Sequence, residues 1–249
     1  MKKSLCFLLV IVLLLSTFAF VGCNNTVETI TSEDGKWEYV INDDDTITLV
    51  SINEMTENMV IPSVIDSHTV STFGEKLFVV INDGKENKKF DGVYDDNNIL
   101  KTVKIEANIK VIPNMCFYLC RKLTNVTSPD TLEKISDFAF YGCSELSNIE
   151  LPEKCNSLGA YTFRECGNLK NVVINYDGVP DVGDKCFYMV NNKASNDDQY
   201  YIIPNLSIKV KNIELFSLDA LEAKRKETRN NSYKYWKEYV SNECVGAKA

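Results

Sequence analysis

Few residues of this sequence are arranged as a catalytic site requires. His68 is the only histidine, so a Ser-His-Asp or Cys-His arrangement would have to use it. It stands in Asp66-Ser67-His68-Thr69, where we expect a turn and an exposed side chain. A single histidine also argues against a histidine-based zinc site. We therefore expect no catalytic residue and no metal-binding residue.

The cysteines are the next candidates for chemistry. Nine are present, and two of them, Cys6 and Cys23, lie in or just after an apolar N-terminal segment. The other seven are Cys116, Cys120, Cys143, Cys155, Cys166, Cys186 and Cys244. This odd number argues against a fully paired disulfide framework. Cys116 and Cys120 have the spacing of half a metal site, but buried structural thiols are the favoured interpretation. Neighbouring cysteines of the repeat described below could lie about 4.8 Å apart, so a disulfide is allowed but not predicted.

Acidic clusters could bind calcium or catalyse glycoside hydrolysis, but neither use has a matching pattern. Asp43-Asp44-Asp45 and the group Asp91, Asp95 and Asp96 offer the oxygen ligands that calcium prefers. Neither has the spacing of an EF-hand loop, so we expect solvated acidic loops. No pair of carboxylates stands out for glycoside hydrolysis, and no glycine-rich phosphate loop is present. No cofactor is expected.

The charge balance excludes one class of partner. The formal net charge is -8, with 27 basic and 35 acidic residues, and loss of Lys2 and Lys3 with a leader would make it -10. An acidic chain has no general attraction for phosphate backbones, so nucleic acid is not an expected partner.

The N-terminus has the pattern of an export signal. Met1-Lys2-Lys3 precedes the almost wholly apolar run from Leu5 to Phe20, which suits a secretory leader and is short for a membrane-spanning helix. Phe20-Val21-Gly22-Cys23 resembles the lipobox of bacterial lipoproteins, although Phe20 departs from the usual Leu, Val or Ile. The resemblance implies that residues 1–22 are a signal peptide and that Cys23 is lipidated. The mature protein would then be anchored by lipid in the cell envelope or at the surface, with residues 23–35 as a flexible tether. A plain signal peptide or an uncleaved anchor is the alternative.

A 23-residue repeat organises the middle of the chain. Its leucines are Leu100, Leu123, Leu146 and Leu169, followed three residues later by Val103, Val126, Ile149 and Val172. Its phenylalanines are Phe117, Phe140, Phe163 and, one residue late, Phe187, and the first three are followed by Cys120, Cys143 and Cys166. A unit of this size cannot bury its own apolar face, so we expect stacked coils that form a solenoid with parallel strands on one face.

Alternation along each expected strand separates inward from outward positions. With Leu100, Val103 and Ile105 inward, one outward column is Lys104, Thr127, Glu150 and Val173. A second is Thr102, Asn125, Asn148 and Asn171, whose amides are expected to bond the backbone of neighbouring coils. The first column and the insertion at 79–99 are the candidate binding surfaces.

The ends of the repeat region differ from its middle, as the ends of a solenoid must. We assign residues 36–216 to the solenoid, with polar insertions near 79–99 and 188–197. An N-terminal β-hairpin, from Trp37 to Ile41 and from Thr46 to Val50, is expected to cover the first coil. Tyr201 to Pro204 looks like one further strand of the repeat. Residues 217–249 are rich in helix formers and predict a helical C-terminal cap that carries Trp236 and Tyr239.

The repeat resembles the BspA-like leucine-rich repeats of bacterial surface proteins over roughly residues 36–204. The best copy runs from Leu123 to Leu146, with Pro129, Ile135, Ala139, Phe140, Gly142 and Cys143 in place. The first unit also matches, except that Ser67 stands where the family usually has glycine. The resemblance implies a right-handed solenoid, attachment to proteins or cells, and no shared catalytic site.

These observations predict a non-catalytic, surface-tethered protein that mediates protein–protein binding or adhesion. The expected partner is a protein, such as a host matrix protein or another envelope component. Two alternatives remain open. One is an envelope enzyme, or its accessory subunit, that uses carboxylates on the solenoid face, and the other is a purely structural envelope protein.

Overall fold

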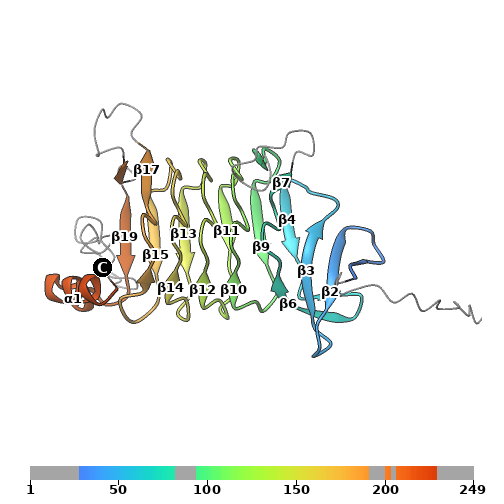
Figure 1. Ribbon diagram of the computed structural model, residues 1–249, viewed down its shortest axis with the longest axis horizontal. Helices are drawn as coiled ribbons and strands as arrows, with labels where there is room; N and C mark the ends of the chain where they lie inside the picture. The colour runs from blue at the N-terminus through green and yellow to red at the C-terminus, as the bar shows by residue number, and fades with distance from the viewer. Residues whose placement is uncertain (1–27, 82–93, 191–199, 203–205, 229–249) are drawn as a thin grey trace, which may run out of the picture.

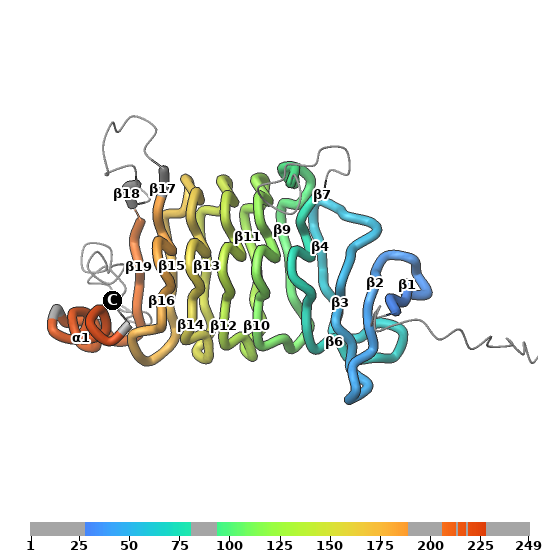
Figure 2. Tube along the Cα trace, in the orientation of Figure 1, coloured from blue at the N-terminus to red at the C-terminus, as the bar shows by residue number. Residues whose placement is uncertain are grey.

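The computed structural model describes residues 28–81, 94–190, 200–202 and 206–228. These residues form an elongated stack of coils, in which strands far apart in the sequence stand side by side (Figure 1). One row contains the strands β4 (Asn58–Ile61), β9 (Thr102–Ile105), β11 (Asn125–Thr127), β13 (Asn148–Leu151), β15 (Asn171–Ile174) and β19 (Ser207–Val210). A second row contains β10 (Val111–Ile112), β12 (Lys134–Ile135), β14 (Ser157–Leu158) and β16 (Asp181–Val182). The chain turns back from the first row to the second in each coil (Figure 2).

The register of the parallel strands follows the sequence repeat. Asn125 pairs with Thr102, and Asn171 pairs with Asn148, in each case 23 positions apart. Across the longer gap before β19, Ser207 pairs with Asn171. Equivalent residues therefore lie side by side on neighbouring coils, and the predicted parallel sheet of a leucine-rich-repeat fold is confirmed.

The first row is divided into two sheets. The hydrogen-bonded orders are β4-β9-β11 and β13-β15-β19, although β11 and β13 are neighbours in the stack (Figure 1). Pro129 and Pro152 occupy equivalent positions after β11 and β13, and neither has an N–H to donate. Because β11 nevertheless pairs with β9, the proline does not account for the break. We call the junction of β11 and β13 the seam.

The inward positions form one continuous core between the two rows. The phenylalanine rings stack along its length, with centroid separations of 4.6 Å for Phe78–Phe117, 4.9 Å for Phe117–Phe140 and 5.4 Å for both Phe140–Phe163 and Phe163–Phe187. The repeat leucines are fully buried beside them, at Leu100, Leu123, Leu146 and Leu169. Burial of these large apolar groups in every coil is the main favourable contribution to stability.

The expected hairpin is present at the N-terminal end. β2 (Trp37–Ile41) and β3 (Ile47–Ile52) are antiparallel, and they join β1 (Ile30–Thr31), β6 (His68–Phe73) and β5 (Val64–Ile65) in one five-stranded sheet. Thus the stretch 23–35, for which we expect a tether, is described from residue 28 and contains a short strand.

The C-terminal end carries the 3₁₀ helix η1 (Ile213–Phe216) and the helix α1 (Leu218–Thr228), at the opposite end from β2 (Figure 1). Phe216 and Leu221 are buried there. Trp236 and Tyr239, predicted in the helical segment, lie outside the described residues. None of the helices within the described ranges is long and apolar enough to span a bilayer.

The two insertions differ in one respect from the expectation. Short antiparallel pairs lie at their bases: β7 (Val80–Ile81) with β8 (Tyr94–Asp95), and β17 (Tyr188–Val190) with β18 (Tyr200–Ile202). The prediction that Tyr201 to Pro204 begins another strand of the repeat is therefore wrong. The last strand of the row is Ser207–Val210, because its alternation buries Ile208 and Val210 against the core.

Candidate functional site

The four predicted binding residues lie on the outward side of the first row. Lys104 pairs with Thr127 across β9 and β11, and Glu150 pairs with Val173 across β13 and β15. The column continues to Val60 on β4, which is 49% exposed, and to Lys209 on β19. We call these six residues the outer column: Val60, Lys104, Thr127, Glu150, Val173 and Lys209. Their participation in binding stays a prediction.

The second predicted column also runs along the row, but its amides do not bond as expected. Asn171 Nδ2 donates to Asn148 Oδ1 at 2.6 Å, and Thr102 Oγ1 donates to Asn58 Oδ1 at 2.7 Å. These are bonds between side chains across neighbouring strands, and they are exposed. The expectation that the amides would bond backbone groups is wrong because the main-chain groups are already used in the strand ladders. The carboxamides instead face solvent.

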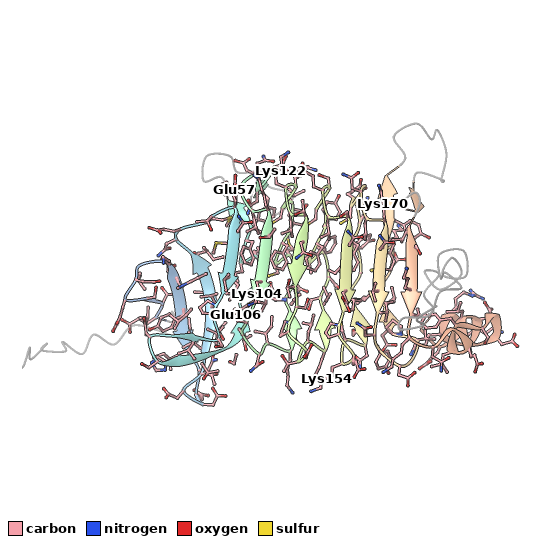
Figure 3. All side chains as sticks on the ribbon, turned by 180° about the vertical axis from the view of Figure 1, so that it is seen from behind. Glu57, Lys104, Glu106, Lys122, Lys154 and Lys170 are labelled. Carbon is pink, nitrogen blue, oxygen red and sulfur yellow. The ribbon has the colours of Figure 1, made fainter. Side chains whose placement is uncertain are left out.

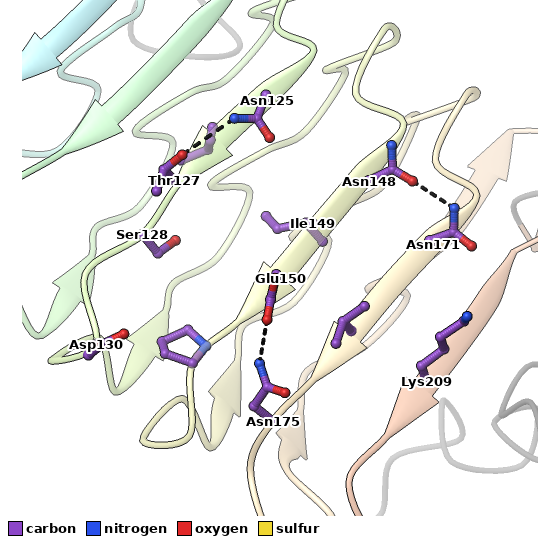
Figure 4. Close-up of a pocket in the computed structure, with 13 residues that line it drawn as sticks. Asn125, Thr127, Ser128, Asp130, Asn148, Ile149, Glu150, Asn171, Asn175 and Lys209 are labelled. Carbon is purple, nitrogen blue, oxygen red and sulfur yellow. Dashed lines mark hydrogen bonds between the residues drawn. The ribbon is translucent and has the colours of Figure 1, made fainter. Parts of the chain in front are cut away.

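A hollow of about 650 Å³ lies over the seam (Figure 4). Its walls come from β11, β13, β15 and β19 and from the residues that follow the first three of these strands. The lining residues are Asn125, Val126, Thr127, Ser128, Asp130, Asn148, Ile149, Glu150, Pro152, Asn171, Val173, Asn175 and Lys209. The hollow therefore contains three of the four predicted binding residues, and Lys104 lies beyond it on β9.

The charged side chains of this face are of both signs. Glu150 Oε1 accepts a hydrogen bond from Asn175 Nδ2 at 2.9 Å (Figure 4). Lys104 Nζ pairs with Glu106 Oε1 at 2.6 Å, and Figure 3 shows the two side chains close together. Both members of this pair are substantially exposed, so it adds little to stability. The face is polar and presents hydrogen-bonding groups beside charges.

Some lining residues were missed from the sequence. Ser128, Asp130 and Asn175 follow strands and were not assigned to either column. The sequence did contain a signal for Asn175. It lies 23 residues after Pro152, so the two residues occupy equivalent positions in adjacent coils. What the repeat could not show is the seam between β11 and β13.

His68 is not part of this surface. It is the first residue of β6, with its side chain 24% exposed, and its Nδ1 lies 3.3 Å from Asp45 Oδ1 and 3.2 Å from the carbonyl of Asp45. The prediction of an exposed turn residue is therefore wrong in detail, since the turn itself is Asp66-Ser67. The strand position brings His68 against the first hairpin, where it contacts Asp45 and not a nucleophile.

The described cysteines are core residues, as predicted. Cys116, Cys120, Cys143, Cys155, Cys166 and Cys186 are all buried free thiols. Cys143 Sγ donates to the carbonyl of Phe117 at 3.1 Å, and Cys166 Sγ donates to that of Phe140 at 3.0 Å. Burial raises the pKa of Cys155 and of Cys186 to about 12. Such thiols are protonated at neutral pH and are poor nucleophiles.

The first acidic cluster is a hydrogen-bonded turn. Asp44 Oδ1 accepts hydrogen bonds from Thr46 Oγ1 at 2.6 Å and from Thr46 N at 3.1 Å, and these bonds lower the pKa of Asp44. In the second cluster, Asp96 pairs with Arg121 at 2.6 Å, and Asp91 lies outside the described residues. Within the described ranges, no group of three or more His, Cys, Asp or Glu side chains is placed to hold a metal ion.

Comparison with known proteins agrees with this geometry. The model of the BspA type leucine rich repeat region matches residues 91–200 in six copies. A leucine-rich-repeat protein of T. pallidum shares the fold, with a TM-score of 0.52 and 22% identity over 71% of this chain and 72% of its own. A leucine-rich-repeat protein of Bacteroides capillosus is 22% identical over 59% of this chain and 97% of its own, with a TM-score of 0.47. No curated protein matches the sequence. Six repeat copies, together with parallel strands in the register of the repeat, show that residues 91–200 form a BspA type leucine rich repeat region.

Proposed function

We propose that this protein binds a protein partner through the outer column and the hollow beside it, as a non-catalytic adhesion or binding protein of the cell envelope. The observation that carries the proposal is the hollow itself. It exposes carboxamides, hydroxyls and charges from four strands on a rigid framework, and a regular solenoid face of this kind suits an extended contact. The partner would be a host matrix protein or another envelope component, and no cofactor is involved.

The proposal includes a tether and two capped ends. The leader and Cys23 support export and a lipid anchor, which would present the solenoid at the surface without a spanning helix. The β2–β3 hairpin and α1 would cap the first and last coils of a right-handed solenoid. Their buried residues, Trp37 and Tyr39 at one end and Phe216 and Leu221 at the other, support this role.

Substitutions on the two rows test where the partner binds. Val60→Arg and Thr127→Arg place long cations on the outward side of the first row, while Val111→Arg does the same at a 37% exposed valine of the second row. The full chain would be assayed in mild detergent against purified matrix proteins and isolated envelope proteins. We expect saturable binding with a dissociation constant of about 1 μM or tighter. Val60→Arg and Thr127→Arg should weaken it, and Val111→Arg should leave it unchanged. Equal binding by all three variants would rule out the first row as the contact surface.

A carboxylate enzyme is the second candidate, because Glu150 and Asp130 line the same hollow. Glycoside hydrolysis needs two carboxyl groups on either side of the scissile bond. Incubation of the full chain with envelope and matrix polysaccharides would release reducing ends if this were the activity, and Glu150→Gln would abolish that release. Absence of any release leaves the binding function as the better account.

A further inference from the structure

A side chain at the lining of the hollow is buried without a partner. Ser128 Oγ has no hydrogen-bond partner among the described residues. Buried polar groups are normally paired, so an unpaired hydroxyl at the lining of a hollow needs an explanation. A ligand seated over the seam would supply one by bringing its own polar groups to this place.

The exposed carboxamides have further hydrogen-bonding capacity. Within the described residues, the Oδ1 atoms of Asn125, Asn171 and Asn175 accept no hydrogen bond, while their amide nitrogens donate to Thr127, Asn148 and Glu150. A carboxamide offers the same donor and acceptor groups as a peptide bond. The lining can therefore pair with main-chain amides of a partner. Such pairing depends little on the partner's side chains.

The dimensions fit a short length of extended chain. The lining reaches across four strands, from β11 to β19. Three strand spacings of about 4.8 Å make about 14 Å, which is the length of roughly four residues of extended polypeptide. The lining contains no Phe, Tyr or Trp, so a carbohydrate would find no aromatic ring to stack on. These two observations favour a peptide segment over a glycan.

The charges indicate which side chain the segment carries. Three charged residues line the hollow, and two of them, Asp130 and Glu150, are acidic and exposed. The third, Lys209, lies on β19 at the far end of the lining (Figure 4). A lysine or arginine over the β11–β13 side would face both carboxylates, and an acidic side chain there would be repelled.

We propose that the hollow over the seam binds an extended segment of about four residues from a protein partner. The asparagine carboxamides pair with its main-chain amides, and Asp130 and Glu150 pair with one basic side chain. This inference rests on the proposed function, and it specifies the part of the partner that contacts the hollow: an extended segment with one basic side chain.

A library of eight-residue peptides with uncharged, capped ends tests the inference on the full chain in mild detergent. Selected peptides should share one lysine or arginine. Methylation of single main-chain nitrogens in the best peptide should weaken binding roughly fivefold at the positions that bond the carboxamides. The double substitution Asn125→Leu and Asn171→Leu should abolish selection, and Glu150→Gln should weaken binding about threefold. Asn98→Leu changes an exposed residue and Glu133→Gln a partly exposed one, both outside the hollow, and they serve as controls. Thermal unfolding monitored by circular dichroism checks that each variant is folded.

The outcomes separate this inference from the proposed function. If selected peptides keep their affinity after every single methylation, or bind the double asparagine variant as well as wild type, the segment model is wrong. If no peptide is selected while a folded partner still binds in a manner sensitive to Thr127→Arg, the inference fails and the proposed function stands. If the wild-type chain binds a glycan and Glu150→Gln abolishes that binding, the peptide assignment is overturned. If the wild-type chain selects no peptide and binds no partner protein, both proposals are refuted.

Discussion

At the scale of single residues, the turn between β5 and β6 holds two non-glycine residues in a conformation that favours glycine. Ile65 pairs with His68, so Asp66 and Ser67 form a two-residue hairpin loop, with φ angles of 46° and 71°. Both angles lie in the left-handed region, which glycine adopts most easily. Asp66 compensates through its side chain, which accepts hydrogen bonds from Tyr39 Oη at 3.0 Å and from Glu33 N at 3.1 Å. Ser67 makes no such contact with the described part of the chain.

The substitution Ser67→Gly is therefore expected to stabilise the protein. Relief of the left-handed strain should outweigh the entropy of glycine and raise the free energy of unfolding by about 0.5–1 kcal/mol. Urea unfolding monitored by circular dichroism measures this change. Asp66→Gly is the matched control, and it should not stabilise because it removes the bonds to Tyr39 and Glu33. A lower stability for Ser67→Gly would contradict the strain argument.

The buried thiols predict a loss of stability at high pH. Burial raises the pKa of five of them above the usual value of 9: Cys116, Cys120, Cys143, Cys155 and Cys186. The folded protein therefore keeps protons that the unfolded chain releases above pH 9. The stabilising contribution is complete below that pH and falls as the pH rises further. Each thiol can contribute up to about 1.4 kcal/mol per pH unit.

Urea unfolding under reducing conditions between pH 8 and pH 10 tests this dependence. The wild type should lose stability steeply above pH 9, and Cys120→Ala should show a shallower slope because one titrating group is gone. Identical slopes for the two proteins would show that Cys120 does not take part.

At the scale of elements, the coils are held together by ladders of identical side chains. Phe140 stacks between Phe117 and Phe163 and is fully buried. Phe138, two residues earlier, is half-buried and stacks on Tyr161 at 4.9 Å. The two rings have the same size and belong to the same coil, so their comparison isolates the effect of burial.

Phe140→Ala should cost about 3–5 kcal/mol of unfolding free energy, because it opens a cavity in the middle of the stack. Phe138→Ala keeps the Cβ atom and the backbone angle and removes only a partly exposed ring, so it should cost less than about 1.5 kcal/mol. Denaturant unfolding of both variants measures the two losses of unfolding free energy. Equal costs would mean that the stack is not the main support of the coil.

At the scale of the whole molecule, the question is how the solenoid is held in the envelope. The first strand, β1, begins at Ile30 and already joins the first sheet. If Cys23 is lipidated, only a few residues separate the anchor from the folded body. The solenoid would then lie close to the membrane. Its partner would have to reach the outward side of the first row near the membrane surface.

Lipid attachment at Cys23 can be tested by metabolic labelling. A labelled fatty-acid precursor should mark the wild-type protein and not Cys23→Ala, while Cys6→Ala should be labelled like wild type because Cys6 precedes the expected cleavage point. Equal labelling of the wild type and Cys23→Ala would refute the lipobox assignment.

The repeat by itself determined most of the coil architecture. A period of 23 residues requires that equivalent positions stack, so the inward Leu, Val, Phe and Cys positions and the column from Lys104 to Val173 could be read directly from spacing. The side on which each residue lies followed from the alternation along a strand, which is a local property.

Only the tertiary structure decided where the repeat is interrupted. Tyr200–Ile202 has the composition of a repeat strand but pairs with β17, because strand pairing depends on which edge is within reach as well as on composition. The seam at β11 and β13 is likewise a property of two neighbouring coils, because the sequence repeat is regular there and only the pairing of the strands shows that they belong to separate sheets. The hollow lies over that seam. Its residues could be named in part from the repeat, but which of them line one hollow depends on how the strands are arranged in space.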